Sequence, residues 1–257
     1  MFIHEVDGAM LILKTMDEIE EIRKSCQIVA DCHREVKKMI RPGVTTMEIE
    51  ELFIRIMKDR GATPYTIGYK GYPYATCTSV NDVIAHGFPN HKPLKEGDIV
   101  KVDTVALYNG WMGDSCWCYA VGEVSPAAEK LMRVTKECLD IAIGLARPGN
   151  RLGDLMSALQ EHAESNGFSV VRDLVGHGIG RELHEEPQVP HYGKAGKGFR
   201  LKEGMVLTIE PMINAGRYQM TIDDDGWTAR TADGSLSAQY EHTIAITADG
   251  PIILTEQ

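Results

Sequence analysis

The sequence predicts an α+β fold in which two similar halves each combine a pair of helices with antiparallel strands. Arg41-Pro42-Gly43 ends a helical pattern in the first half, and Arg147-Pro148-Gly149 ends another one 106 residues later. The segments Leu94–Asp103 and Leu201–Glu210 begin with the same four residues, continue as apolar strands and end on a carboxylate. Their offset of 107 residues is almost the same. The sequence therefore predicts a duplicated unit with a pseudo-two-fold axis between its halves.

Four helices are expected from apolar residues at helical spacing and from residues typical of helix ends. Thr15 and Thr45 each stand three residues before a glutamate, which is the capping-box pattern that begins a helix. Ser125-Pro126 begins the third helix, because serine caps a helix well and proline suits the first helical position. A fourth helix, rich in leucine, is expected to end at Gly167.

Length, composition and charge are those of a globular chain with an excess of acid. We expect one domain over residues 1–257, made of halves at about 1–122 and 123–257. The net charge of −10 argues against nucleic acid or an anionic membrane as the main partner. No apolar run approaches a membrane span, and the first residues lack the basic start and long apolar run of a secretory leader. A cytoplasmic location is therefore expected.

The cysteines are predicted to be free and mostly to fill the core. The six contain no C-x-x-C pair, and a disulfide framework is not typical of a chain of this size and composition. Cys116 and Cys118 make a C-x-C pattern, which is a poor zinc spacing. Two adjacent positions on one face of a strand explain that pattern better.

A hairpin in the first half is the most informative segment. The turn Asn109-Gly110 is a strong hairpin marker between the strands Ile99–Tyr108 and Trp111–Val121. With a two-residue turn, Asp103 and Asp114 lie one diagonal step apart on the same face of the hairpin. The sequence thus predicts two carboxylates that converge on one side of a sheet.

Converging carboxylates on a half-buried face are costly unless positive charge lies between them. Lys101 is the one basic residue of the segment, and it stands at the start of its strand, so a metal ion is favoured over a lysine partner. Glu210 takes the matching strand position in the second half, and Glu241 lies in the alternating, strand-like segment Leu236–Ile244. Four strand carboxylates are expected, two from each half.

Three histidines lie in loops rich in glycine or proline. His177 stands in Gly176–Gly180, where glycines let the backbone approach a ligand or turn sharply. His184 follows seven residues later, and His86 lies in the related segment Ala85–Pro89. The other six are interpreted as structural or surface residues: His4, His33, His91, His162, His191 and His242.

One imidazole with four carboxylates suits manganese, iron, cobalt or zinc. Because carboxylates can bridge, such a set can hold two ions that share a water molecule and polarise a carbonyl, which is amide hydrolysis chemistry. No nucleophile-elbow, phosphate-loop or dinucleotide motif competes with this assignment.

These residues resemble the type I methionine aminopeptidases from about Thr15 to Thr255. The resemblance rests on Gly176–Gly180 with His184–Pro187, on Thr208–Pro211 and on Ser237–Thr243. It implies the pita-bread (creatinase/aminopeptidase) fold. It also implies a hydrolase that removes the initiator methionine from nascent proteins, preferring a small second residue, by attack of a hydroxide that bridges two metal ions.

The same resemblance implies a role for each site residue. Asp103 would chelate one ion, Asp114 and Glu241 would bridge both, and His177 with Glu210 would complete the second. Glu210 would also carry the proton. The substrate would meet His86 at the amide and His184 at the carbonyl oxygen. The methionine pocket would be lined by Tyr69, Tyr72, Cys77 and Trp227, and a monovalent cation would fall near Asn81 and Ser237.

Two positions depart from the resemblance. The family often has histidine where this chain has Lys70 and an aromatic residue where it has Leu183, and both positions bear on the fine substrate preference. The identity of the divalent metal (Co, Mn, Fe or Zn) and any contact with the ribosome are not fixed. A monomer is expected, because nothing in the sequence requires more.

Two other functions are found on this fold. A prolidase or Xaa-Pro aminopeptidase of the same fold usually carries a large extra N-terminal domain, for which a first helix near Thr15 leaves little room. A non-enzymatic binding protein on this fold would have lost metal ligands, whereas all five positions are filled here.

Overall fold

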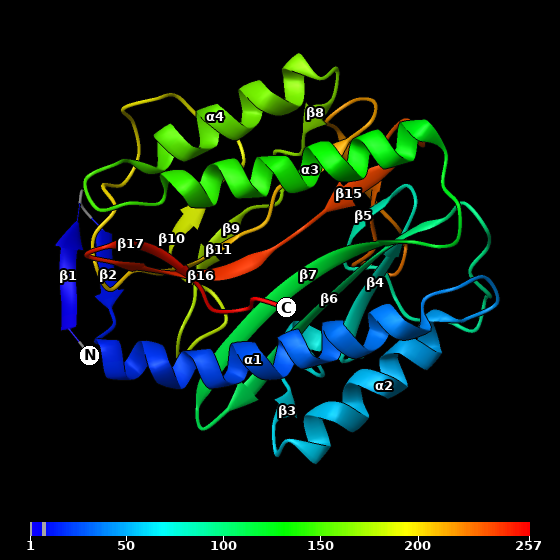
Figure 1. Ribbon diagram of the computed structural model, residues 1–257, viewed down its shortest axis with the longest axis horizontal. Coiled ribbons are helices and arrows are strands. Elements are labelled where there is room, and N and C mark those ends of the chain that lie inside the picture. Colours follow the sequence, from blue (N-terminus) through cyan, green and yellow to red (C-terminus); the bar gives the residue numbers. More distant parts are fainter. Residues whose placement is uncertain (1, 7–8) are drawn as a thin grey trace.

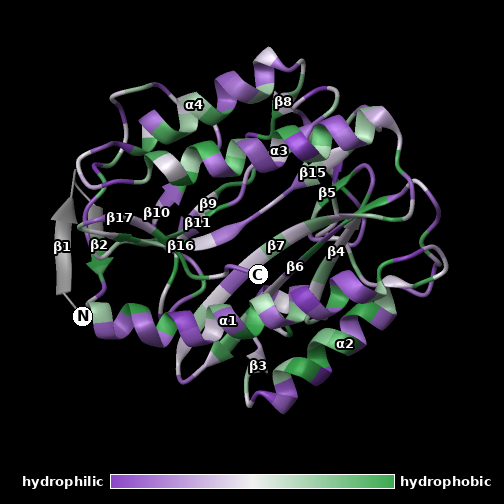
Figure 2. Cartoon of the chain, viewed as in Figure 1, coloured by the Kyte–Doolittle hydropathy of each residue, from purple (hydrophilic) through white to green (hydrophobic). Residues whose placement is uncertain are grey.

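The computed structural model describes residues 2–6 and 9–257, with side chains from Leu11 onward. Two helix pairs enclose the strands, with α1 and α2 along one side and α3 and α4 along the other (Figure 1). The helices are α1 (Met16–Met39), α2 (Thr46–Asp59), α3 (Pro126–Leu145) and α4 (Leu152–Ser165). In Figure 2 each helix mixes hydrophilic and hydrophobic residues, as amphipathic helices do.

The strands are short, except for the hairpin of the first half. That half contains β1 (Phe2–Val6), β2 (Ala9–Leu13), β3 (Thr63–Pro64), β4 (Thr76–Val80), β5 (Val83–Ala85), β6 (Ile99–Tyr108) and β7 (Trp111–Ala120), with the 3-10 helix η1 (Tyr69–Gly71). The second half contains β8 (Ser169–Val170), β9 (Gly176–Gly178), β10 (Glu185–Val189), β11 (Val206–Ile209), β12 (Met212–Asn214), β13 (Met220–Ile222), β14 (Ala229–Thr231), β15 (Ser237–Gln239), β16 (His242–Thr247) and β17 (Gly250–Ile253).

The pairings are antiparallel throughout the described strands. In the first half β6 pairs with β3, β4 and β7. In the second half the order is β10-β9-β11-β16-β17, and β15-β12-β8 forms a separate sheet. The small sheet β13-β14-β5 combines strands of both halves, and β1 pairs with β2.

The predicted helix ends are confirmed. Thr15 and Thr45 each form a complete capping box with the glutamate three residues on. The Ser125 side chain accepts a hydrogen bond from the backbone of Ala128, and proline fills the first turn of α3. Of the helices that the structure describes, none is long and apolar enough to cross a membrane.

The two halves close their first helix with the same contact. The Gly43 N–H donates to the carbonyl of Leu94 at 2.8 Å, and the Gly149 N–H donates to the carbonyl of Leu201 at 3.0 Å. Both glycines have positive φ, 92° and 96°, which an L side chain adopts poorly. The shared tripeptides therefore reflect a shared turn, docked on the shared Leu-Lys-Glu-Gly segment.

The predicted register of the hairpin is confirmed. Tyr108 pairs with Trp111 across the turn and Asp103 pairs with Cys116, with no shift along the ladder. Asp114 pairs with Val105, which leaves both aspartates on one face. The prediction of six free cysteines is also confirmed, since all six are buried and unpaired.

The prediction that Glu210 and Glu241 lie inside strands is wrong. Glu210 falls in the break between β11 and β12, and Glu241 falls in the break between β15 and β16. At Glu210 and at Glu241 the backbone passes from one sheet to another. On one side of these residues β11 pairs with β16, and on the other side β12 pairs with β15. The backbone N–H of Glu241 donates to the carbonyl of Cys116, at 2.8 Å, and so bonds across to β7 of the first half.

Gly113 lets helix α1 approach strand β7 beside Asp114. A Cβ atom at this position would overlap the backbone of Ser25 and Cys26. We expect Gly113→Ala to lower the free energy of unfolding by about 1 to 3 kcal/mol, because a packed backbone must shift to admit the methyl group. Urea denaturation of the two proteins measures this loss.

Gly144 provides the matched control, since it lies exposed in α3 with nothing near its missing Cβ. Gly144→Ala is expected to leave stability unchanged or raise it by up to about 1 kcal/mol. Equal effects of the two substitutions would contradict the packing argument.

His33 joins α1 to β7 inside the core. Its Nδ1 lies 2.8 Å from Tyr119 Oη, and its Nε2 lies 3.2 Å from the carbonyl oxygen of Ser115. Burial lowers the pKa of His33 to about 4. The unfolded chain therefore takes up the proton first as the pH falls, and the folded state loses stability below about pH 6.5.

We expect this one residue to remove about 2 kcal/mol of unfolding free energy between pH 7 and pH 5. Urea midpoints at both pH values, in one metal-free buffer, should show a smaller loss in His33→Gln than in the wild type. The same exchange at exposed His91 is the control and should leave the wild-type pH dependence. An identical pH dependence in His33→Gln would count against the linkage.

Candidate functional site

One cavity of about 550 Å³ collects the side chains that the sequence singled out. It is lined by residues of both halves, and it contains every residue predicted for the divalent metals, for catalysis and for the methionine pocket: Asp103, Asp114, His177, Glu210, Glu241, His86, His184, Tyr69, Tyr72, Cys77 and Trp227. Lys70 and Leu183, at which the sequence departs from the resemblance, line it too. A second cavity of similar volume lies beyond β4, and of the predicted site residues it contains only Asn81.

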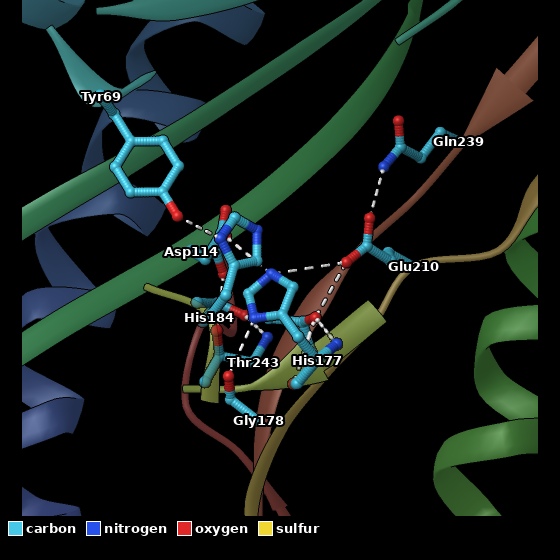
Figure 3. Close-up of polar contacts among 10 residues, drawn as sticks. Tyr69, Asp114, His177, Gly178, His184, Glu210, Gln239 and Thr243 are labelled. Atoms are coloured by element: carbon cyan, nitrogen blue, oxygen red, sulfur yellow. Dashed lines mark hydrogen bonds and ion pairs between the residues drawn. The ribbon is translucent and has the colours of Figure 1, made fainter. Parts of the chain in front are cut away.

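The carboxylates and His177 form its centre, and Figure 3 shows Asp114 and Glu210 on either side of His177. One ligand atom each from Asp114, His177 and Glu241 lies within 4.8 Å of the other two. His177 Nε2 lies 3.7 Å from Asp114 Oδ2 and 3.8 Å from Glu210 Oε1. Both distances are less than twice the roughly 2.1 Å of a metal–ligand bond, so one ion could contact both atoms of each pair.

The four carboxyl groups are buried together. Burial raises the pKa of Asp103 to about 7, and burial with the charge of Asp103 raises the pKa of Glu210 to about 8. Burial and the neighbouring carboxylates raise the pKa of Asp114 and of Glu241 well above the usual range. Protein charges alone therefore do not stabilise four ionised carboxylates here.

Lysine and arginine do not supply the missing positive charge. Among the side chains that the structure describes, from Leu11 onward, no ion pair joins a basic residue other than His177 to these four carboxylates. Lys101, the alternative partner in the sequence, directs its ammonium to two backbone carbonyls instead. Asp114 Oδ1 and Glu241 Oε2 are buried without a hydrogen-bond partner. This donor set suits divalent cations.

His177 is held ready to act as a neutral ligand. Its Nδ1 lies 3.0 Å from the carbonyl oxygen of Gly178, which turns Nε2 toward the carboxylates. Burial, with the adjacent His184, lowers the pKa of His177 to about 3, so the imidazole is uncharged at neutral pH.

Two residues that hold Glu210 were missed in the sequence. Thr208 Oγ1 donates to Glu210 Oε1 at 2.9 Å and accepts from the His177 N–H at 3.0 Å. Gln239 Nε2 lies 3.3 Å from Glu210 Oε2 and donates to it. The position of Thr208, two residues before Glu210 and therefore on the same strand face, was the available clue.

The glycines around His177 serve strand packing. A Cβ at Gly176 would lie 2.6 Å from the carbonyl oxygen of Thr208, and one at Gly178 would overlap the backbone of Glu186. Neither glycine has a positive φ. These two glycines were expected to approach a ligand or to make a sharp turn. They instead allow close contact with the neighbouring strands.

His184 and His86 face the cavity from different sides. The His184 ring lies 4.3 Å from the His177 ring, and its Nδ1 lies 2.6 Å from Tyr69 Oη (Figure 3). His86 has φ of 58°, in the left-handed region, and its ring lies 6.0 Å from that of Trp227. Burial lowers the pKa of both histidines, so both are neutral at physiological pH.

The expected methionine pocket is an aromatic corner beside the carboxylates. The rings of Tyr72 and Trp227 meet edge to face at 5.1 Å. Tyr72 Oη donates to backbone oxygens, which leaves its ring as the cavity wall. Cys77 lies in β4 and is buried. A supporting residue that was not predicted is Glu50 of α2. Its buried carboxylate accepts hydrogen bonds from Ala75 and Thr76, just before Cys77.

Five of the remaining histidines have described side chains, and none of the five lines the cavity. His33 and His242 are buried and hydrogen-bonded, and His162 pairs with Glu137. His191 is buried and His91 is exposed, while the side chain of His4 lies outside the described residues. Their interpretation as structural or surface residues stays consistent with these positions.

Comparison with known proteins adds independent information. Residues 20–248 match Metallopeptidase family M24. The chain is 50% identical to "Methionine aminopeptidase A" of Synechocystis, over 96% of this chain and 98% of that protein. It is 49% identical to "Methionine aminopeptidase 1" of Bacillus subtilis, over 96% and 99%.

Solved structures agree with these relatives. The methionine aminopeptidase of Thermotoga maritima superposes with a TM-score of 0.95 at 49% identity, covering 96% of this chain and all of that one. The prolidase of Pyrococcus furiosus superposes with a TM-score of 0.75 at 27% identity, and the match covers only 66% of the prolidase. The predicted pita-bread fold is confirmed, and the chain belongs to metallopeptidase family M24, among its methionine aminopeptidases.

Proposed function

We propose that this chain is a metal-dependent aminopeptidase that removes the N-terminal methionine from proteins and prefers a small second residue. One observation carries the proposal. Four carboxylates from the two halves are buried against a neutral imidazole and adjoin an aromatic pocket, and no lysine or arginine side chain within residues 11–257 pairs with them. A protein keeps such a set when bound cations complete it.

Asp103, Asp114, His177, Glu210 and Glu241 would hold two divalent ions. When bound, such ions supply the positive charge that polarises a carbonyl and makes water a nucleophile near neutral pH. Whether the ions are cobalt, manganese, iron or zinc is decided by availability as much as by this donor set.

The chain's own groups would handle the proton and the developing charge. Glu210 is oriented by Thr208 and Gln239, so its carboxylate can take a proton from water and pass it to the departing amide nitrogen. Tyr69 occupies Nδ1 of His184, which leaves Nε2 to donate to the carbonyl oxygen as negative charge develops there. His86 would contact the scissile amide.

The methionine side chain would enter the corner of Tyr69, Tyr72, Cys77 and Trp227. Sulfur packs well against aromatic edges, and the edge-to-face pair of Tyr72 and Trp227 offers such a wall. Lys70 lies at the same cavity with its Nζ 5.3 Å from the centroid of the Tyr69 ring, so it can influence the residues that follow methionine.

The setting of the enzyme follows from its proposed substrate. The partners would be N-terminal peptides of nascent proteins, met in the cytoplasm and in reach of the ribosome, with the chain acting as a monomer. We also propose one catalytic domain over residues 1–257 with duplicated halves at about 1–122 and 123–257, supported by the matching turns at Gly43 and Gly149.

The activity test uses the tripeptide Met-Ala-Ser with Mn²⁺ or Co²⁺. We expect release of methionine, and we expect Asp114→Asn to lower kcat/KM by more than about 100-fold. Loss of a residue that only hydrogen-bonds to a metal ligand typically lowers activity about 10- to 100-fold, and loss of a ligand shared by two ions should lower it further. Asp140→Asn, on the exposed face of α3, is the control and should retain wild-type activity. Cleavage of Xaa-Pro dipeptides alone would instead indicate a prolidase.

The metal-free protein should reveal the buried carboxylates. The pKa of Glu210 is raised to about 8, so the folded state keeps the proton while the unfolded chain loses it near pH 4.5. Stability contributed by the protonated group is thus lost as the pH rises toward 8. In chelator, the Tm of Glu210→Gln relative to wild type should rise by several degrees from pH 5.5 to pH 8, which corresponds to about 1 to 3 kcal/mol.

Calorimetry with and without Mn²⁺ measures the Tm of the metal-bound and metal-free proteins. Added metal should raise the Tm of the wild type more than that of Glu210→Gln. The exposed Glu203 offers a matched control, since Glu203→Gln should follow the wild type at each pH. A gap between Glu210→Gln and wild type that does not change with pH would contradict a buried, ionisable Glu210.

A further inference from the structure

A buried lysine joins the two halves behind the carboxylates. Lys101 lies in β6 with 1% of its surface exposed. Its Nζ donates to the carbonyl oxygen of Asn81 at 3.0 Å and to that of Ser237 at 2.7 Å. Asn81 belongs to the first half and Ser237 to the second, so one ammonium group bridges the seam.

Independent contacts aim the Asn81 carbonyl at this place. Asn81 has φ of 52°, and its side-chain amide donates to Asp98 and accepts from the backbone of Ile99. The same carbonyl oxygen accepts from the Ser237 N–H at 3.1 Å. Its orientation is therefore built into the chain rather than imposed by the lysine.

Lys101 and Ser237, which this contact joins, each lie close along the chain to a proposed metal ligand. Lys101 precedes Asp103 by two residues in β6, and Ser237 precedes Glu241 by four. Between them in β15, Gln239 donates to Glu210. A change in the distance between Lys101 and Ser237 would therefore shift the positions of carboxylates in both halves.

Two carbonyl oxygens that converge in a buried place attract a cation. Here the ammonium of Lys101 satisfies them, and it occupies the position near Asn81 and Ser237 at which the family resemblance implied a monovalent cation. A free ion would need the same space and would bring a second positive charge against the ammonium. The residues present do not fit an additional cation.

We propose that Lys101 is a positioning residue that replaces a monovalent cation. Its ammonium holds β6 and β15 at the spacing that the carboxylates need, so the protein works without K⁺ or Na⁺. The proposal rests on the proposed function only in naming what is positioned. The alternative is a lysine that merely fills space in the core.

The test measures Tm in chelator, and methionine release in Mn²⁺, with K⁺, Na⁺, ammonium or tetramethylammonium chloride at equal ionic strength. Wild type should show the same Tm and rate in all four salts. Lys101→Ala in tetramethylammonium should lose about 5 °C or more of Tm, because it removes the ammonium from the Ser237 carbonyl and one of the two hydrogen bonds from the Asn81 carbonyl. K⁺ or ammonium, which can take the place of the lost side-chain ammonium, should restore most of that loss and of the activity.

Two further variants separate positioning from bulk. Lys101→Met fills the space without charge, so no salt should restore it. Lys14→Ala removes the other buried lysine, which pairs with Glu185, and it should show no preference for K⁺ over tetramethylammonium.

A wild type that is stabilised or activated by K⁺ over tetramethylammonium would overturn the proposal, whether or not Lys101→Ala folds. Equal recovery of Lys101→Ala in every salt, or no loss at all, would overturn it too. Absence of methionine release from the wild type in any salt would count against the proposed function instead, while the Tm series in chelator would still decide the role of Lys101.

Discussion

The burial of four carboxylates in one cavity is the constraint on which the rest of this structure depends. Asp103 and Asp114 come from one half and Glu210 and Glu241 from the other, and no lysine or arginine of the described side chains, Leu11 to Gln257, pairs with them. Such an arrangement destabilises the fold unless cations complete it. The fold must therefore hold the two halves together firmly, at the very level where their negative charges meet.

Hydrogen bonds across the seam provide that hold. Ser115 Oγ donates to the carbonyl of Glu241, and Thr243 Oγ1 donates to the carbonyl of Asp114, at 2.9 and 2.7 Å. With the bond from the Glu241 N–H to Cys116, they tie β7 to the break between β15 and β16. The backbones of the proposed ligands are thus the groups that join the halves, so the site and the seam are one structure.

Much of this could be predicted from the sequence, and the omissions other than Thr208, which has a local clue, share one cause. Helix ends and the hairpin register depend on residues close in sequence, so the local pattern was sufficient for Thr15, Ser125 and Asp103. The break at Glu241 depends on a backbone bond to the other half. The same is true of the Lys101 contact with Ser237. Such partners leave no local pattern, and only the duplication suggested where to look for them.

The hydrogen bonds of Lys101 to backbone carbonyls explain why the carboxylates remain available to metal ions. Lys101 and Asp103 are two residues apart in one strand, so their side chains share a face and a direct ion pair was within reach. The carbonyls of Asn81 and Ser237 hold the ammonium away from the carboxylates instead. One internal cation stabilises the backbone of the seam, and the charge that the chemistry requires is left to ions that can bind and polarise a substrate. Pairing the lysine with Asp103 would stabilise the chain but would remove a metal ligand.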